Sequence, residues 1–278
     1  MPYPRINPVL FRIGPLHVRW YGLMYVLGFL ISYFLIKHQE KTRPVGLSPG
    51  LIQDLLFYLA IGLLAGGRLG YIVFYQYMNL PELVRDPLEI IAVWHGGMSF
   101  HGGLLGAVFA GWWFCKRKKL SFWAVADRVI VTVPIALGLG RIGNFINGEL
   151  FGRPSNVPWA MVFPGGGPLA RHPSQLYEAL MEGAVLFIVL WLLRRRAFRE
   201  GMMVGFFLFF YGIFRFFLEF FRDPDAQLGF ILGPFTMGQV LSMTMILCAV
   251  LIAVLTGEQW DRNNSAMKKR RKSEKPKV

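Results

Sequence analysis

The chain alternates between long apolar runs and short polar connectors. Seven runs have the length expected of membrane-spanning helices, at residues 20–37, 51–75, 98–115, 123–141, 174–193, 201–221 and 234–256. An α-helix needs about 20 predominantly apolar residues to cross the hydrocarbon layer of a membrane. The pattern therefore predicts an all-α, polytopic integral membrane protein with seven transmembrane helices.

The composition favours membrane helices over the buried helices of a soluble protein. Hydrophobic residues make up 54% of the chain and charged residues only 17%, and the mean hydropathy is +0.44. The middle five runs contain ionisable residues, but all seven recur with short basic connectors between them, as membrane spans do. The two cysteines lie in apolar runs and in no metal-ligand pattern, so the sequence predicts no metal site and no disulfide framework.

Basic residues are distributed unequally between the two sides of the predicted bundle. The formal net charge is +14, and 19 of the 30 lysines and arginines lie in the connectors that follow the first, third, fifth and seventh runs. Cytoplasmic loops of membrane proteins are enriched in these residues. The distribution predicts a periplasmic N-terminus and a cytoplasmic C-terminus, and it explains the positive charge without a nucleic-acid partner.

The same pattern divides the chain into two parts. Residues 1–256 form the predicted seven-helix transmembrane domain, and residues 257–278 form a basic cytoplasmic tail. The tail is highly charged and shows no helical periodicity, so we expect it to be disordered. The N-terminal residues lack the short apolar core of a secretory signal peptide, and we expect them to be retained.

Ionisable residues within the predicted spans gather toward the periplasmic side. With a helical rise of about 1.5 Å per residue, Arg68, Arg141 and Arg215 are expected in the outer leaflet or at its boundary, and His101 within one turn of the outer end. Charged groups in spans usually face a bundle interior or a water-filled cavity. We therefore expect a cavity lined by the three arginines, in which nearby glutamates neutralise part of the charge and a lipid phosphate neutralises the rest.

The segment at residues 140–152 concentrates the polar chemistry of the chain. Its sequence, GRIGNFINGELFG, ends an apolar run. Its four glycines permit close approach of a ligand or of another helix. Arg141 supplies a permanent planar cation suited to phosphate or carboxylate, and Asn144 and Asn147 supply amide donors and acceptors. This combination predicts a binding site at the end of a helix.

Two side chains in other runs, Arg215 and His101, each allow a structural and a functional interpretation. Tyr211, Arg215 and Glu219 are spaced by four residues and share one helix face. Arg215 could therefore form a structural ion pair with Glu219, or it could bind an anion while Glu219 positions it. His101 could be a buried structural histidine or a general base. A hydrolase built on Ser99 and His101 is disfavoured, because residues two apart on a helix face different directions.

Two glutamates in the fifth run add a constraint. Glu178 and Glu182 lie one turn apart on the same predicted helix face, where two carboxylates repel each other. At least one of them is therefore expected to meet an arginine.

Six segments of the chain together resemble one family. They are RWYGLMY at 19–25, GGRLGY at 66–71, GGMSFHGG at 96–103, GRIGNFINGELFG at 140–152, RHPSQLYE at 171–178 and YGIFRFFLEFFR at 211–222. In this order they strongly resemble prolipoprotein diacylglyceryl transferases, bacterial enzymes that lipidate lipoprotein precursors. The likeness covers nearly the whole chain except the basic tail, and it implies a seven-helix enzyme of the inner membrane whose active site faces the periplasm.

The resemblance implies a reaction and a set of site residues. The diacylglyceryl group of phosphatidylglycerol would pass to the lipobox cysteine thiol of a preprolipoprotein, forming a thioether and releasing glycerol-1-phosphate. No metal or cofactor is expected, because the donor lipid already carries its leaving group. Arg141 and Arg215 match the two essential arginines of the family, and His101 matches its proposed base. With Arg141, the residues expected to bind phosphatidylglycerol are Tyr21, Arg68, Asn144, Asn147, Glu149, Gly152, Tyr211 and Glu219.

One position departs from the family pattern, and two other functions compete with this interpretation. Some members carry a histidine two residues before the tyrosine of the first span, where this chain has Arg19, so a strict requirement for that histidine is in doubt. The first alternative is a lipid transporter or flippase, which would need polar residues along a full path, whereas the cytoplasmic third of the spans is mainly apolar. The second alternative is a non-catalytic membrane protein that binds phosphatidylglycerol.

Overall fold

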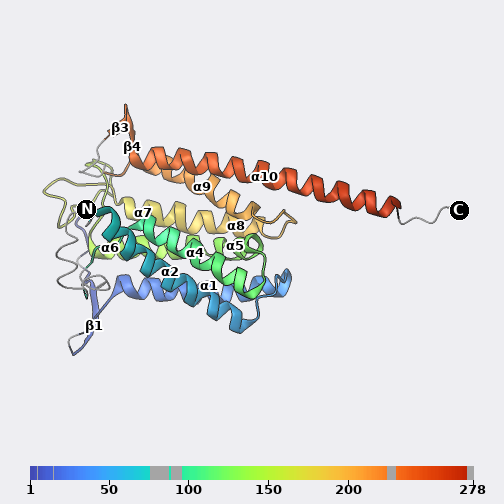
Figure 1. The fold of residues 1–278 in the computed structure, drawn as a ribbon. Coiled ribbons are helices and arrows are strands. Elements are labelled where there is room, and N and C mark those ends of the chain that lie inside the picture. The colour runs from blue at the N-terminus through green and yellow to red at the C-terminus, as the bar shows by residue number, and fades with distance from the viewer. Residues whose placement is uncertain (5, 15, 76–87, 89–95, 224–229, 274–278) are drawn as a thin grey trace. The chain divides into compact units, whose positions relative to one another are not determined.

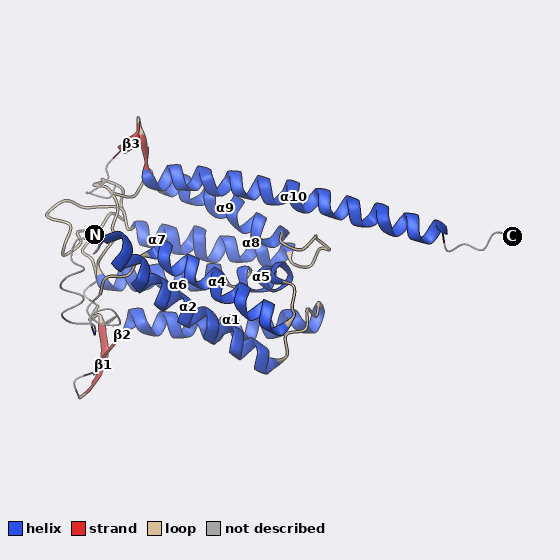
Figure 2. Ribbon diagram, in the orientation of Figure 1, coloured by secondary structure: helices blue, strands red, loops and turns tan. Residues whose placement is uncertain are grey.

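The computed structural model describes residues 1–278 except 5, 15, 76–87, 89–95, 224–229 and 274–278. The described chain is mostly helical and carries two short hairpins (Figures 1 and 2). It divides into two compact units, a larger one of Met1–Ser32 with Asp127–Val278 and a smaller one of Tyr33–Ala126.

The smaller unit is built on two helices that pack through glycines. Its elements are the last part of α1 (Trp20–Thr42), α2 (Pro49–Tyr75), α4 (Phe100–Lys118) and the start of α5 (Phe122–Ile130). A Cβ atom at Gly62 would lie 2.5 Å from the Gly106 carbonyl oxygen, and one at Gly66 would lie 2.4 Å from that of Gly102. Only glycine permits backbones to approach this closely, as at the small-residue interfaces of membrane helices.

The larger unit contains the remaining helices and both hairpins. Its elements are β1 (Val9–Ile13), β2 (Leu16–Arg19), the first part of α1, the end of α5, α6 (Val133–Asn147), α7 (Ser174–Glu178), the π-helix η4 (Ala179–Val185), α8 (Leu186–Leu193), α9 (Met202–Leu218), β3 (Phe230–Leu232), β4 (Phe235–Thr236) and α10 (Met237–Ser273). β1 pairs antiparallel with β2, and β3 with β4. These two small sheets are additions to the all-α architecture that the hydrophobic pattern predicts.

Within the described residues, four helices are long and apolar enough to cross a membrane: Trp20–Thr42, Pro49–Phe74, Ser174–Leu193 and Met237–Leu255. The helices α5 and α6, which are bent by 42° at the break between them, form a fifth if they are counted as one span. The two other predicted spans coincide with α4, which ends in three basic residues, and α9, which has 17 residues. The protein is thus a mostly helical membrane protein with four or five candidate spans, while the count of seven and the orientation stay predictions.

The last helix extends beyond the predicted seventh span. α10 continues to Ser273, so the backbone of most of the predicted disordered tail is helical. The tail is rich in lysine and arginine, which have good helix propensity, and a helix already formed propagates more readily than a new one begins. Residues 274–278 lie outside the described part of the chain.

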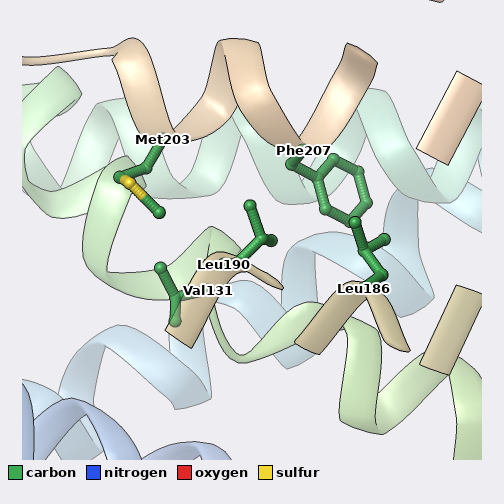
Figure 3. Packing of buried hydrophobic residues seen from close by; sticks show 5 residues of the cluster. All are labelled: Val131, Leu186, Leu190, Met203 and Phe207. Carbon is green, nitrogen blue, oxygen red and sulfur yellow. The ribbon is translucent and has the colours of Figure 1, made fainter. Parts of the chain in front are cut away.

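A buried apolar cluster joins three helical segments of the larger unit. It consists of Val131, Leu186, Leu190, Met203 and Phe207 (Figure 3). These residues come from the break before α6, from α8 and from α9. Large apolar side chains on other faces of α8 and α10 are exposed, as expected of helices that meet lipid rather than water.

The N-terminal segment packs against the end of α6. The Tyr3 hydroxyl donates a hydrogen bond of 2.9 Å to the Ile146 carbonyl oxygen and another to that of Phe145. The Tyr3 and Phe163 rings are in contact, with centroids 5.1 Å apart. The first residues therefore help to fix the end of the helix that carries Arg141 and Asn144.

Candidate active site

Arg141 on α6 is ion-paired with the helix that follows it. α6 begins after a two-residue break and has Pro134 near its start, where the fixed φ of proline suits a first helical turn. Arg141 Nε lies 2.8 Å from Glu178 Oε2, and its Nη2 lies 3.6 Å from Glu182 Oε2. The expected meeting of these glutamates with an arginine is therefore present, and it involves both of them.

Arg215 on α9 contacts the same two carboxylates. Its Nη1 donates to Glu178 Oε1 at 2.9 Å and lies 3.7 Å from Glu182 Oε1. Its Nη2 lies 2.8 Å from Glu219 Oε2, one helical turn further along the chain. Arg215 thus forms the local pair expected from its spacing and also a pair that crosses to α7.

The two shared carboxylates are enclosed, whereas the arginines are partly accessible. The side chains of Glu178 and Glu182 are 1% and 0% exposed, and those of Arg141 and Arg215 are 19% and 14% exposed. Glu178 ends α7, and Glu182 lies in the π-helix η4. π-helical turns are rare and occur often at functional sites. An incoming anion would therefore meet guanidinium groups before it met a carboxylate.

Glu219 is fixed on both of its oxygens. Oε2 pairs with Arg215, and Oε1 accepts a hydrogen bond of 2.9 Å from the Thr236 hydroxyl. A Cβ atom at Gly238 would lie 2.6 Å from the Glu219 carboxylate, so this position at the start of α10 has room only for glycine. The end of α9 and the start of α10 are therefore joined at this carboxylate.

The charges of this region balance. Arg222 Nη1 lies 3.7 Å from Glu178 Oε1. We call the following residues the arginine–glutamate cluster: Arg141, Arg215, Arg222, Glu178, Glu182 and Glu219. The expected neutralisation by glutamates is therefore present for Arg141 and Arg215, and the expected lipid phosphate stays a prediction. A bound anion would share these arginines with the glutamates.

Two glycine contacts hold η4 and α1 close to α6, the helix that carries Arg141. A Cβ atom on Gly183 would lie 2.7 Å from Gly138 Cα, so α6 and η4 approach with almost no gap. A Cβ atom on Gly143 would lie 2.8 Å from Tyr21 Cδ2, so the Tyr21 ring packs directly on α6. The Tyr21 hydroxyl lies 3.1 Å from that of Tyr25.

The two asparagines after Arg141 converge on one carboxylate. Asn144 Nδ2 and Asn147 Nδ2 donate to Glu149 Oε1 at 2.8 and 3.1 Å. The Gln175 amide donates to the Glu149 carbonyl oxygen at 2.6 Å. Gly148 caps α6 with a positive φ of 69°, which turns the chain back toward these amides. The asparagines thus orient Glu149, and their predicted role in binding phosphatidylglycerol stays a prediction.

Gly152 lies where three chain segments meet. Its amide donates to the His172 carbonyl oxygen at 2.8 Å, and a Cβ atom would lie 2.3 Å from the Phe221 carbonyl oxygen. It forms an isolated antiparallel bridge with Arg222. Close backbone approach therefore explains the glycine, and it places the loop after α6 against Arg222, a member of the cluster in the segment after α9.

A polar group borders the start of α7. His172 Nδ1 lies 3.1 Å from the Tyr177 hydroxyl, which accepts a hydrogen bond of 2.6 Å from Trp159 Nε1. Burial lowers the pKa of His172, because a charged imidazole loses hydration there. Tyr177 precedes Glu178, so this group supports the helix end that carries the central carboxylate.

Tyr211 lies on α9 one turn before Arg215, as its spacing predicts. Its ring stacks on that of Phe207, with centroids 5.5 Å apart and an angle of 15° between the planes. Phe207 belongs to the buried apolar cluster. Tyr211 therefore continues the core toward the arginines.

Arg68 and His101 belong to the smaller unit, and they are described within it. Arg68 is 4% exposed, and its Nη1 donates to the carbonyl oxygens of Gly96 and Gly97 at 2.8 and 3.1 Å. His101 lies exposed in the first turn of α4, so its interpretation as a buried structural histidine is wrong. Ser99 caps this helix by accepting a hydrogen bond from the Gly102 amide.

No group of three or more histidine, cysteine, aspartate or glutamate side chains among the described residues is arranged to hold a metal ion. The predicted absence of a cofactor stays a prediction.

Residues 8–255 match the family described as prolipoprotein diacylglyceryl transferase. The chain belongs to this family. It is 52% identical over 259 residues to the phosphatidylglycerol–prolipoprotein diacylglyceryl transferase of Geobacter sulfurreducens, covering 93% of this chain and 98% of the relative. The enzyme of the same name from Desulfotalea psychrophila is 50% identical over 255 residues, with 90% and 93% covered. The one from Pseudomonas aeruginosa is 51% identical over 255 residues, with 91% and 95% covered.

Membership in the prolipoprotein diacylglyceryl transferase family makes the protein a membrane transferase of lipoprotein biosynthesis. The sequence analysis did not anticipate Arg222 or Thr236 in the cluster. Arg222 lies seven residues after Arg215, a helical spacing that could have suggested it. Thr236 contacts Glu219 across 17 residues of chain, a distance over which helical periodicity predicts nothing.

Proposed function

We propose that the protein transfers the diacylglyceryl group of phosphatidylglycerol to the lipobox cysteine thiol of a preprolipoprotein. The products are a thioether-linked lipid on that cysteine and glycerol-1-phosphate. One observation supports this most strongly: Arg141 and Arg215, from two different helices, meet at Glu178 while parts of both remain accessible. Two adjacent guanidinium groups suit a phosphate ester, which they can bind through several hydrogen bonds.

The arginines have a defined part in this reaction. The cysteine sulfur attacks the glycerol carbon that bears the phosphate ester, so a C–S bond forms and a C–O bond breaks. The bonding electrons leave with the phosphate oxygen, and negative charge grows there. Preorganised donors in a water-poor site stabilise such charge strongly. Arg141 and Arg215 supply these donors in the proposed mechanism.

The thiol proton needs an acceptor. A free cysteine has a pKa of about 8.5, so most of it is protonated at neutral pH. We assign proton abstraction to His101, an exposed imidazole in the first turn of α4. Histidine is the commonest general base near neutral pH.

The remaining candidates bind the lipid in this proposal. Glu149, oriented by Asn144 and Asn147, accepts hydrogen bonds from the glycerol head group. Tyr21 of α1 packs against Gly143 on α6, and Tyr211 lies one turn before Arg215 on α9. Arg68, Gly152 and Glu219 complete the set, with Gly152 shaping the backbone and Glu219 orienting Arg215.

The proposed setting is the bacterial inner membrane. Seven helices span it, the N-terminus and the site face the periplasm, and the C-terminus is cytoplasmic. The basic connectors support this orientation.

A reconstituted assay tests the proposal. The purified protein is incubated with phosphatidylglycerol and a lipobox peptide, and a peptide with serine in place of cysteine is the control. We expect release of glycerol-1-phosphate and a gain of one diacylglyceryl mass on the cysteine peptide only. Binding of the lipid without release would favour the non-catalytic protein, and movement of labelled lipid between leaflets without peptide modification would favour the flippase.

A further inference from the structure

Glu178 is the carboxylate that joins the two arginines of the cluster. Its Oε2 lies 2.8 Å from Arg141 Nε, and its Oε1 accepts from Arg215 Nη1 at 2.9 Å. The other two glutamates are placed differently. Glu182 lies 3.6 and 3.7 Å from the arginines, beyond hydrogen-bond distance, and Glu219 contacts only Arg215 among the arginines whose ion pairs are described.

The contact geometry leaves donors of both arginines available. A guanidinium group has five N–H donors in a fixed planar fork. Arg141 uses Nε for its short contact with Glu178, whereas Arg215 uses Nη1 for Glu178 and Nη2 for Glu219. Glu178 is 1% exposed whereas both arginines are partly accessible, so the carboxylate contacts both guanidinium groups while itself remaining enclosed.

The backbone around Glu178 is held from several directions. One turn earlier on α7, Gln175 and Ser174 bind the carbonyl oxygens of Glu149 and Leu150 at 2.6 and 3.1 Å. After it, the π-helix packs Gly183 against α6. A carboxylate on so constrained a helix end can fix the positions of side chains that reach it from two other helices.

We propose that Glu178 is the positioning residue of the transferase. It sets the distance and orientation between Arg141 and Arg215 so that both can donate to one phosphate group of the lipid. Glu178 itself touches neither the phosphate nor the thiol. This proposal rests on the proposed function, because it specifies how the arginines of that reaction are arranged.

The test compares two isosteric substitutions on neighbouring turns of one helix. Glu178→Gln removes the charge while keeping the shape of the side chain. The two arginines contact different oxygens of Glu178, and glutamine replaces one of these oxygens with an NH2 group, which cannot accept a hydrogen bond. Glu182→Gln is the matched control, because Glu182 is equally buried but lies beyond hydrogen-bond distance of both arginines. We expect kcat per folded molecule to fall by about 10- to 100-fold in Glu178→Gln, with a smaller fall in Glu182→Gln.

A double-substitution cycle separates positioning from a purely structural role. Arg141→Lys is combined with Glu178→Gln, and kcat is measured for both single variants and the double variant. If Glu178 acts through Arg141, the fold decrease in kcat of the double variant is much smaller than the product of the fold decreases in the two single variants. Multiplicative effects, or wild-type kcat in Glu178→Gln, would overturn the proposal.

Two further outcomes are decided by the same assay. If Glu178→Gln does not fold, Glu178→Asp, which keeps the charge on a shorter side chain, is expected to fold and to retain partial kcat. Failure of both to fold overturns the proposal, because the role of Glu178 is then structural. If the wild-type protein releases no glycerol-1-phosphate, the proposed function fails, whereas an active wild type with an unaffected Glu178→Gln variant overturns only the positioning role.

Discussion

At the scale of single residues, the arginines of the cluster depend on the shape of guanidinium as much as on its charge. Arg141 contacts Glu178 through Nε and Glu182 through Nη2. Lysine keeps the charge but presents one compact ammonium group, which cannot hold a carboxylate and also present a planar fork. The two residue types are therefore not interchangeable at this position.

We expect Arg141→Lys to lower kcat by about 100-fold, because one preorganised donor set for the leaving phosphate is lost. The measurement is glycerol-1-phosphate release by folded protein at saturating phosphatidylglycerol. Arg12→Lys, at an exposed position in β1, is the control and should retain full activity. If Arg141→Lys and Arg12→Lys were equally active, Arg141 would not be part of the phosphate-binding site.

His101 provides a second prediction at this scale. Glutamine keeps much of its size but cannot take a proton, so His101→Gln should lower kcat by about 100-fold near neutral pH. His17→Gln, exposed in β2, should have no effect. If His101→Gln folds correctly and turns over at the wild-type rate, another group accepts the thiol proton.

The lowered pKa of His172 gives a pH dependence of stability. The pKa of His172 is held below its ordinary value of 6.5, so below about pH 6.5 the unfolded chain binds a proton that the folded chain resists. The contribution of His172 to the free energy of unfolding is therefore fully present above that pH and is lost as the pH falls. We expect the fall in Tm between pH 8 and pH 5 to be smaller in His172→Phe than in the wild type.

His17→Phe serves as the control for that measurement, since His17 is exposed. It should show the wild-type dependence of Tm on pH. Parallel curves for His172→Phe and the wild type would show that His172 does not contribute.

At the scale of elements, glycines decide which helices can pack at the distance that the cluster needs. A Cβ atom on Gly183 would lie 2.7 Å from Gly138 Cα, whereas one on Gly140 would meet nothing within 4 Å. Both residues lie in helices, so alanine has the same local propensity advantage at each. Comparing alanine substitutions at Gly183 and Gly140 therefore separates the effect of helix packing on stability from the effect of helix propensity.

We expect Gly183→Ala to destabilise the protein by about 1–3 kcal/mol, because η4 and α6 must move apart. Gly140→Ala should be neutral or stabilising, by up to about 1 kcal/mol. Thermal unfolding in detergent measures both variants, and activity should fall only in Gly183→Ala. An equal Tm for the two would show that the contact has room for a methyl group.

The elements also show what the sequence could and could not predict. Periodicity within one helix was enough to place Arg215 and Glu219 together, because four residues make about one turn. It could not determine which carboxylate Arg141 meets, since Glu178 is 37 residues away and the answer depends on how two helices pack. Nor could it determine that the Asn144 amide donates to Glu149, because that contact depends on the turn at Gly148.

At the scale of the whole molecule, the hydrophobic pattern predicted a helical membrane protein, and the structure confirms it with four or five candidate spans. The short hairpins were missed because β1, β2 and β3 lie outside the apolar runs and β4 occupies only two residues at the start of the last run. The basic tail was predicted to be disordered from its charge, but α10 carries helix through most of it. Charge alone does not stop a helix that packing has already started.

The predicted orientation can be measured by labelling single cysteines in whole cells. Cys115 and Cys248 are free and are first replaced by serine. Asn156→Cys, exposed in the loop after α6, should react with a membrane-impermeant maleimide from the periplasmic side. Ala197→Cys, exposed in the basic connector after α8, should react only after the membrane is permeabilised. The reverse labelling would contradict a periplasmic N-terminus.

The balance of charge in the arginine–glutamate cluster has a consequence for the biosynthesis of the protein. The chain emerges from the ribosome with Arg141 first, then Glu178 and Glu182, and Arg215 with Glu219 last. After the second of these stages, two glutamates face one arginine of the final cluster. An uncompensated charge is costly within a membrane, so we expect the helix at Ser174–Leu193 to gain stability when α9 follows it. We therefore expect these helices to insert cooperatively, in the order in which translation supplies their charges.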